Sequence, residues 1–168
     1  MMEQGKMERV LRYVYSSKGL SILLSVLSHT VSTFAAICFV IFGVILFSVS
    51  PLSLVRFLVI IGIPFVAVTL MRRLIDAPRP YEVYDFYEIP PKSKQKSSYP
   101  SRHAFSAFSI GTLICFLSPV VGALLLLFST LMCISRVLLG IHFIRDVVAG
   151  ALIGIISSVL GFIILSPL

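Results

Sequence analysis

Long apolar runs separated by short polar segments dominate this chain. Together these runs predict membrane-spanning helices, because a helix crosses the hydrocarbon of a bilayer with about 20 residues. The uncharged stretches are Thr30 to Val55, Phe57 to Met71, Ala104 to Ser135 and Val147 to Leu168. Ser118-Pro119 predicts a break in the third stretch, because proline interrupts a helix but suits its first turn. The pattern therefore predicts five strong spans.

The N-terminal residues 1–28 form a weaker, amphipathic segment. Charged residues and a glycine interrupt the apolar positions of its main part, Met7 to Ser28. This pattern is typical of a helix that lies in the membrane interface, although a crossing here would add a sixth helix to the bundle. No small-residue cleavage site follows an apolar core, so we expect no removable signal peptide.

The composition supports an integral membrane protein. Of the 168 residues, 58% are hydrophobic and 12% are charged, and the mean hydropathy is +1.04. Repeats and strand-like alternation are absent from the sequence, so we expect one all-α membrane domain over residues 1–168. Gly150, Gly154 and Gly161 predict a small-residue face for packing within the bundle, while the oligomeric state stays open.

The positive charge of the chain is concentrated in a few segments. Seven of the fourteen Lys and Arg residues fall between Arg72 and Arg102, and Arg136 and Arg145 follow later. If the helices alternate across the bilayer, these segments emerge on one face, which predicts an anionic ligand there. A nucleic acid is not expected, because its binding needs an exposed basic groove interleaved with aromatic residues. The seven acidic residues form no clustered set, so no metal site is expected.

The first of three chemical clusters is "RRLIDAPRP", which begins at Arg72. Arg72 and Arg79 are seven residues apart, about two helical turns, and would share a face if the helix ran on. Pro78 and Pro80 argue against a continuous helix. An alternative is that Arg72 and Arg73 only anchor a helix end at the headgroups.

The second cluster is "PSRH", from Pro100 to His103. Ser101 is a favoured N-cap residue, and the free N–H groups of the following turn attract an anion, to which Arg102 adds its charge. His103 lies in the same first turn and would face the anion. An ordinary capped helix start with a snorkelling arginine would have the same sequence.

The third cluster is "SRVLLGIHFIRD", from Ser135 to Asp146. His142 and Asp146 are four residues apart, one helical turn, so the carboxylate can hold one ring nitrogen and leave the other as a lone pair. Such a histidine is suited to act as a nucleophile or base. A simple salt bridge at a helix start is the alternative.

Together the three clusters resemble the type 2 phosphatidic acid phosphatase (PAP2) superfamily, which shares its site with vanadium haloperoxidases. The family pattern is K-x6-RP, then PSGH, then SR-x5-H-x3-D, and the resemblance covers residues 72–146 with every spacing kept. Arg72 stands at the lysine position and Arg102 at the glycine position. Both departures leave the shape of the pocket, and hence the choice of substrate, open.

The resemblance implies a role for each site residue. His142 would attack phosphorus and form a phosphohistidine, Asp146 would orient it, and His103 would protonate the leaving oxygen and later activate water. The residues expected to bind the substrate phosphate are Arg72, Arg79, Ser101, Arg102 and Arg136. The resemblance implies neither a metal nor another cofactor.

The expected function is hydrolysis of a lipid phosphate or diphosphate. Undecaprenyl diphosphate, phosphatidylglycerol phosphate, phosphatidic acid and lipid A phosphates all fit, and the partners are this lipid and the membrane. A non-catalytic lipid-headgroup binder or carrier is the alternative, although it would not need the spacing of His142 and Asp146. A haloperoxidase is disfavoured, because those relatives are soluble.

The resemblance also places the protein in a bacterial cell membrane with its active site on the extracytoplasmic side. The loop charges argue for the opposite orientation, because positive charge favours the cytoplasmic face. The loop over residues 75–100 is expected to carry part of the active site. Its aromatic and basic segment, Tyr81 to Tyr99, is either a lip that contacts headgroups or a solvated connector.

Overall fold

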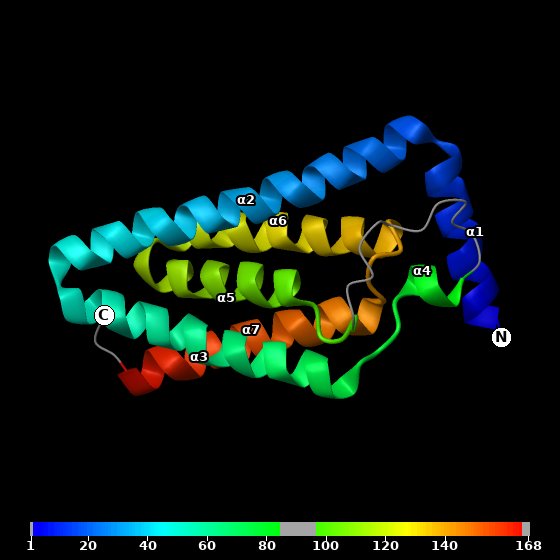
Figure 1. Cartoon of the computed structure of the whole chain (residues 1–168). Helices are drawn as coiled ribbons and strands as arrows, with labels where there is room; N and C mark the ends of the chain where they lie inside the picture. Colours follow the sequence, from blue (N-terminus) through cyan, green and yellow to red (C-terminus); the bar gives the residue numbers. More distant parts are fainter. Residues whose placement is uncertain (1, 85–96, 166–168) are drawn as a thin grey trace.

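The structure is a computed structural model that describes residues 2–84 and 97–165, and every regular element in these ranges is a helix. The helices are α1 (Met2–Ser16), α2 (Lys18–Val49), α3 (Pro51–Ile75), α4 (Pro80–Val83), α5 (Arg102–Leu117), α6 (Pro119–Leu138) and α7 (Ile144–Leu165). The long helices run side by side, with the shorter α5 among them (Figure 1). The predicted all-α bundle is confirmed.

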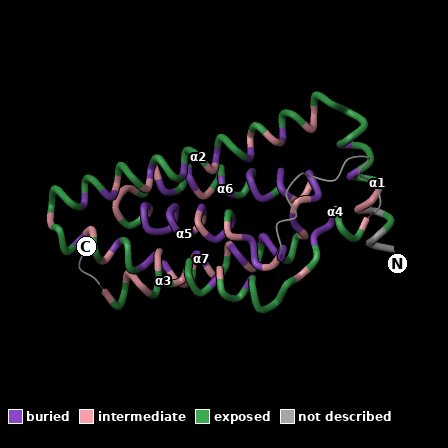
Figure 2. The backbone as a smooth tube through the Cα atoms, in the orientation of Figure 1, coloured by how far each residue is buried: buried purple, intermediate pink, exposed green. Residues whose placement is uncertain are grey.

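Four described segments are long and apolar enough to cross a membrane: Lys18–Val49, Pro51–Val83, Pro119–Leu138 and Ile144–Leu165. α5 has 16 residues and is about 24 Å long, less than the roughly 30 Å of the hydrocarbon layer. The predicted number of five strong spans is therefore not confirmed. Residues on the outward faces of the long helices are exposed (Figure 2), and many of them are large apolar residues, as an integral membrane protein requires.

The N-terminal segment differs from its prediction. The boundary at residue 28 is wrong, because the helix breaks at Ser17 and residues 18–28 are the first turns of the 32-residue α2. α1 lies across one end of the bundle (Figure 1), where Leu11 and Val14 are buried. The Tyr15 hydroxyl donates to the backbone oxygen of Leu139 over 3.1 Å. The described residues contain no sixth span.

The other helix ends follow local sequence signals. α5 ends at Leu117 and α6 begins at Pro119, which confirms the predicted break. α3 ends at Ile75 because Asp76 adopts a left-handed conformation (φ 41°), so Arg72 and Arg79 do not share a helix. Part of the predicted 75–100 loop, and with it most of the expected lip, lies outside the described residues.

The close approach of α5 and α7 brings their N-terminal ends together. A Cβ atom at Gly150 would lie 2.4 Å from the Ser101 carbonyl oxygen, and one at Gly154 would lie 2.6 Å from that of Phe105. The Ser101 N–H donates to the Asp146 carbonyl oxygen over 2.9 Å. The predicted glycine face thus packs inside the bundle and fixes the start of α5 beside the start of α7.

Candidate active site

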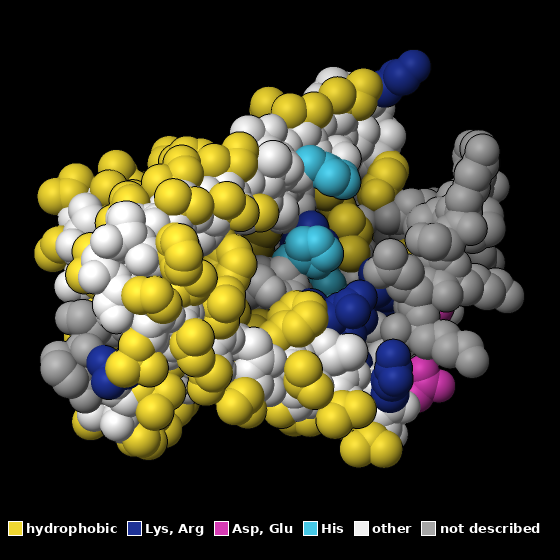
Figure 3. Space-filling view, turned by 60° about the vertical axis from the view of Figure 1, so that its left-hand side comes forward, with side chains coloured by type: hydrophobic (Ala, Val, Ile, Leu, Met, Phe, Trp, Pro, Cys, Tyr) yellow, Lys and Arg dark blue, Asp and Glu magenta, His cyan; other side chains and the backbone are white. Residues whose placement is uncertain are grey.

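The three predicted clusters meet at one end of the bundle. α3 and α6 end there and carry Arg72 and Arg136, while α5 and α7 begin there and carry His103 and Asp146. Figure 3 shows a hollow in which histidine, Lys and Arg side chains gather between apolar surfaces. The dipoles of α5 and α7 also point their positive ends toward this region, which therefore favours an anion.

Ser98 links His142 to Asp146. The Ser98 hydroxyl lies 3.1 Å from Nδ1 of His142 and donates to Oδ2 of Asp146 over 2.5 Å, whereas Nδ1 and Oδ2 are 3.6 Å apart. All three side chains are buried. Because the hydroxyl proton goes to the carboxylate, the hydroxyl oxygen is left to accept a proton from Nδ1. The expected pairing of histidine and aspartate is therefore made through a serine.

This arrangement fixes the chemistry of His142. With its proton on Nδ1, the ring presents Nε2 as a lone pair. Burial lowers the pKa of the His142 imidazole below its ordinary range, as do the charges of Arg79 and Arg136, while the Asp146 carboxylate acts in the opposite direction. His142 is consequently neutral at pH 7 and available as a nucleophile or base.

Arg72 holds the loop that carries Ser98. Its guanidinium donates to the carbonyl oxygens of Ser98 over 3.0 Å and Pro100 over 2.6 Å, and also to that of Ser97. The Ser98 N–H donates to the Ala77 carbonyl oxygen over 2.8 Å. The sequence predicts that Arg72 binds phosphate, but in the structure its guanidinium N–H groups donate to backbone carbonyl oxygens.

Arg136 and Arg79 are buried beside the histidines. Both guanidinium groups lie within electrostatic range of His142, and Arg136 also lies within range of His103. Nε of Arg136 is buried and has no hydrogen-bond partner within residues 2–84 and 97–165. A buried guanidinium donor normally has an acceptor, so an anionic group is the natural ligand for Arg136.

Ser101, Arg102 and His103 begin α5 as predicted. The Ser101 hydroxyl accepts from the Ala104 N–H over 3.4 Å and caps the helix. His103 lines a cavity of about 240 Å³ whose other walls include Phe65 and Ile110. Arg102 lines the same cavity and a second, polar one of about 460 Å³. The start of α5 therefore stands between an apolar and a polar space.

Ser98 is the site residue that the sequence analysis missed. It lies 44 residues before His142, and serine is common in loops, so no spacing rule points to it. Its place two residues before the predicted "PSRH" cluster is the one available signal. Among the described residues, no three or more His, Cys, Asp or Glu side chains gather as metal ligands would.

The fold and the site define a membrane-embedded helical bundle with buried histidines and arginines at one end. The chain belongs to the PAP2 superfamily, because the family's sequence model matches residues 53–167. Phosphatases of this superfamily are hydrolases that act on lipid phosphates, and the structure has their membrane lipid phosphatase fold.

Three comparisons illustrate this relationship. The bacitracin transport permease protein BcrC of Bacillus licheniformis is 41% identical over 66 residues, which are 39% of this chain and 32% of that relative. The match thus spans about a third of the relative's length. A PAP2-type phosphatidylglycerolphosphate phosphatase from Bacillus subtilis has a TM-score of 0.72 at 23% identity, covering 95% of this chain and 84% of that one. LpxE of Aquifex aeolicus has a TM-score of 0.67 at 23% identity, covering 92% and 93%.

Replacing Ser98 by alanine tests its role as a positioning residue. We expect Ser98→Ala to lower kcat for phosphate release about 10- to 100-fold, because Nδ1 of His142 loses its acceptor. The imidazolium form also loses stabilisation, so the acidic limb of the kcat/KM profile moves to lower pH. Ser98→Thr keeps the hydroxyl and serves as the control that retains both rate and profile. An unchanged profile in Ser98→Ala would contradict the role.

Proposed function

We propose that this protein hydrolyses a lipid phosphate or diphosphate through a phosphohistidine intermediate. The observation that carries the proposal is the chain of contacts from Asp146 through Ser98 to Nδ1 of His142. These contacts leave Nε2 of a buried, neutral imidazole for attack. A protein that only binds a headgroup has no need of such a nucleophile.

In the first step, Nε2 of His142 attacks phosphorus and forms the P–N bond while the P–O bond to the leaving group breaks. Burial and the charge of Arg136 lower the pKa of His103 to about 3, so His103 first takes a proton from the bound phosphate and then gives it to the leaving oxygen. The imidazole becomes cationic, and its Nδ1–H stays bonded to Ser98 and, through it, to the Asp146 carboxylate. The buried carboxylate thereby stabilises the charge that forms on His142.

In the second step, water replaces His142. His103 takes a proton from the water, whose oxygen attacks phosphorus as the P–N bond breaks, and phosphate is released. The proton on His103 leaves with the phosphate, and both histidines return to their starting forms. Arg79 and Arg136 hold the phosphoryl oxygens through both steps, together with the N–H groups behind Ser101. These groups supply the positive charge that metal ions supply in other phosphatases, so we propose a metal-independent reaction.

The cavity beside His103 supports a lipid substrate. Its lining runs from Arg102 and His103 along α5 to Ile110, with Phe65 and Ala35 on the facing helices. An acyl or prenyl chain would lie along these apolar side chains, which places the bond to be cleaved near His103. Undecaprenyl diphosphate, phosphatidylglycerol phosphate, phosphatidic acid and lipid A phosphates are all phosphates or diphosphates of lipids that carry such chains.

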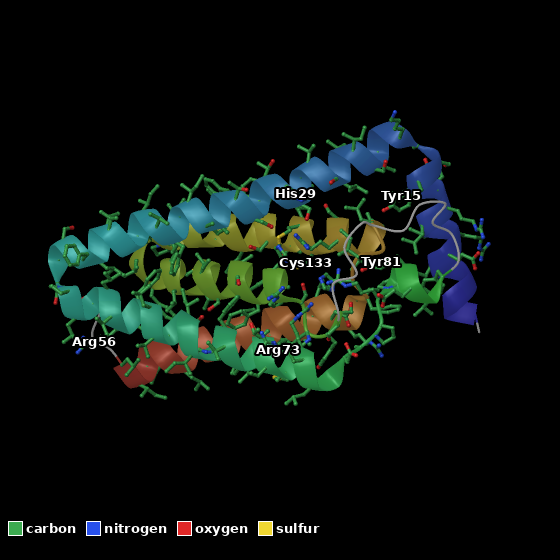
Figure 4. The ribbon with its side chains drawn as sticks, in the orientation of Figure 1. Tyr15, His29, Arg56, Arg73, Tyr81 and Cys133 are labelled. Carbon is green, nitrogen blue, oxygen red and sulfur yellow. The ribbon has the colours of Figure 1, made fainter. Side chains whose placement is uncertain are left out.

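The nucleophile is tested by His142→Asn, with His29→Asn as a matched control. His29 is an exposed histidine of α2 (Figure 4) whose Nδ1 lies 2.8 Å from the Ser25 carbonyl oxygen. Phosphate release from the candidate lipids is measured in the presence of EDTA. We expect His142→Asn to lose at least about 10³-fold in kcat, because asparagine cannot form the intermediate, and His29→Asn to keep wild-type activity.

Near wild-type turnover in His142→Asn would refute the mechanism. Activity that disappears with EDTA and returns with magnesium would refute metal independence. Tight lipid binding without turnover in the wild-type protein would instead support the alternative of a headgroup carrier.

We also propose that the active site faces away from the cytoplasm in a bacterial cell membrane. The support is the family resemblance, since lipid phosphates recycled in envelope synthesis appear on the outer leaflet. The charges favour the reverse: apart from the four site arginines Arg72, Arg79, Arg102 and Arg136, six Lys and Arg residues in the described ranges belong to elements at the catalytic end and only Arg56 to the opposite end. We base the proposed orientation of the active site on the family resemblance.

Cysteine labelling decides the orientation. Ser17 at the start of α2 and Ser48 at its far end are both exposed, so each is replaced by cysteine in a background without Cys38, Cys115 and Cys133. We expect a membrane-impermeant thiol reagent to label Ser17→Cys in intact cells, and Ser48→Cys only after permeabilisation. The reverse pattern would place the active site in the cytoplasm.

A further inference from the structure

Arg102 is the residue shared by two different cavities. On one side it joins His103 in lining the apolar cavity of about 240 Å³ between α2, α3 and α5. On the other side it lines the polar cavity of about 460 Å³, together with Thr69 and Arg73 of α3 and with Asp76, which follows the end of that helix. The two spaces therefore meet at this arginine.

The two cavities follow one face of α3. Phe65 lines the apolar cavity, and Thr69 and Arg73 follow at spacings of four residues in the polar one. Residues three and four apart lie on the same side of a helix. An amphipathic ligand along this face would have its tail at Phe65 and its charged part at Arg73.

The polar cavity carries an excess of positive charge. Its ionisable lining residues are three arginines and one aspartate, a formal charge of +2. Arg72 directs donors to loop carbonyls, but Arg73 and Arg102 have no ion pair within residues 2–84 and 97–165. Arg73 is exposed on α3 at the catalytic end (Figure 4). Two arginine side chains are therefore available to an anion.

The proposed reaction determines what lies next to Arg102. His103 gives its proton to the leaving oxygen, so the group bonded to that oxygen lies beside His103 and its neighbour Arg102. In a lipid diphosphate this group is the second phosphate, and in a glycerol-bridged lipid with two phosphates the second phosphate follows after the glycerol. A lipid monophosphate has only its tail at this place.

We propose that Arg102 and Arg73 form a second anion subsite, which binds a non-transferred phosphate located between the reacting phosphorus and the lipid tail. This inference rests on the proposed function and narrows its substrate class to lipids with two phosphates in the headgroup. In a diphosphate the second phosphate gains negative charge as the P–O bond breaks. Guanidinium groups beside it stabilise that charge in the transition state, so they act on kcat as well as on binding.

The test uses pairs of substrates with the same tail. Prenyl diphosphate is compared with prenyl monophosphate, and phosphatidylglycerol phosphate with phosphatidic acid. We expect Arg102→Gln and Arg73→Gln each to lower the ratio of kcat/KM for two-phosphate over one-phosphate lipids about tenfold or more. Arg56→Gln, at the opposite end of the bundle (Figure 4), keeps the wild-type ratio. The pair with the larger change identifies whether the second phosphate comes from a diphosphate or from a glycerol-bridged headgroup.

A ratio that stays at the wild-type value in both variants would overturn the subsite and leave Arg102 as general electrostatics. Binding of inorganic pyrophosphate and phosphate, measured by calorimetry, separates this failure from a failure of the proposed function. If the wild-type protein hydrolyses no lipid, the proposed function fails. In that case the subsite is still supported if pyrophosphate binds more tightly than phosphate to the wild type and if Arg73→Gln loses this preference. Equal affinities of the wild type for the two anions would overturn the subsite.

Discussion

The active site depends on the contacts of one buried guanidinium. Arg72, at the end of α3, donates to backbone oxygens of the segment from Ser97 to Pro100. A buried charge is costly unless hydrogen bonds surround it, so the end of α3 and this loop are held in one arrangement. This loop places the Ser98 hydroxyl beside His142 and leads into Ser101, the residue that caps α5. A lysine could not donate to these carbonyl groups with a planar guanidinium. The arginine at position 72 therefore has a structural role, which is to hold this loop.

The packing of α5 against α7 provides the rest of the geometry. Gly150 and Gly154 let the two helices approach until the Ser101 N–H reaches the Asp146 carbonyl oxygen. The starts of two helices, with their positive dipole ends, are thereby placed beside Arg136. Positive charge is thus concentrated at the end of an apolar bundle, where an anion joined to a lipid tail can be bound from the membrane.

Much of this arrangement could be predicted from the sequence, because it depends on local rules. Apolar runs predicted the helices, proline and serine marked the limits of α5, and the motif spacing singled out residues that the fold brings to one end. Two features could not be predicted. The break at Ser17 has no proline to mark it, and Gly19, two residues further on, lies inside α2. The role of Ser98 depends on a contact with His142 across 44 residues that only tertiary packing creates. Likewise, the donors of Arg72 go to backbone carbonyls, which have no sequence signature.

The central claim is that His142 carries the phosphoryl group during turnover, and the most direct measurement is to detect that group. In His103→Ala the water that releases phosphate lacks its base, whereas an aryl phosphate has a leaving group that needs no acid, so with this substrate the intermediate should form and accumulate. After a short reaction with an aryl phosphate and a quench at alkaline pH, where phosphohistidine survives, mass spectrometry of the peptides should find the phosphoryl group on His142. No such adduct should form in His142→Asn. Turnover of the same aryl phosphate by the wild type, with no adduct in His103→Ala or with the group on another residue, would contradict the account.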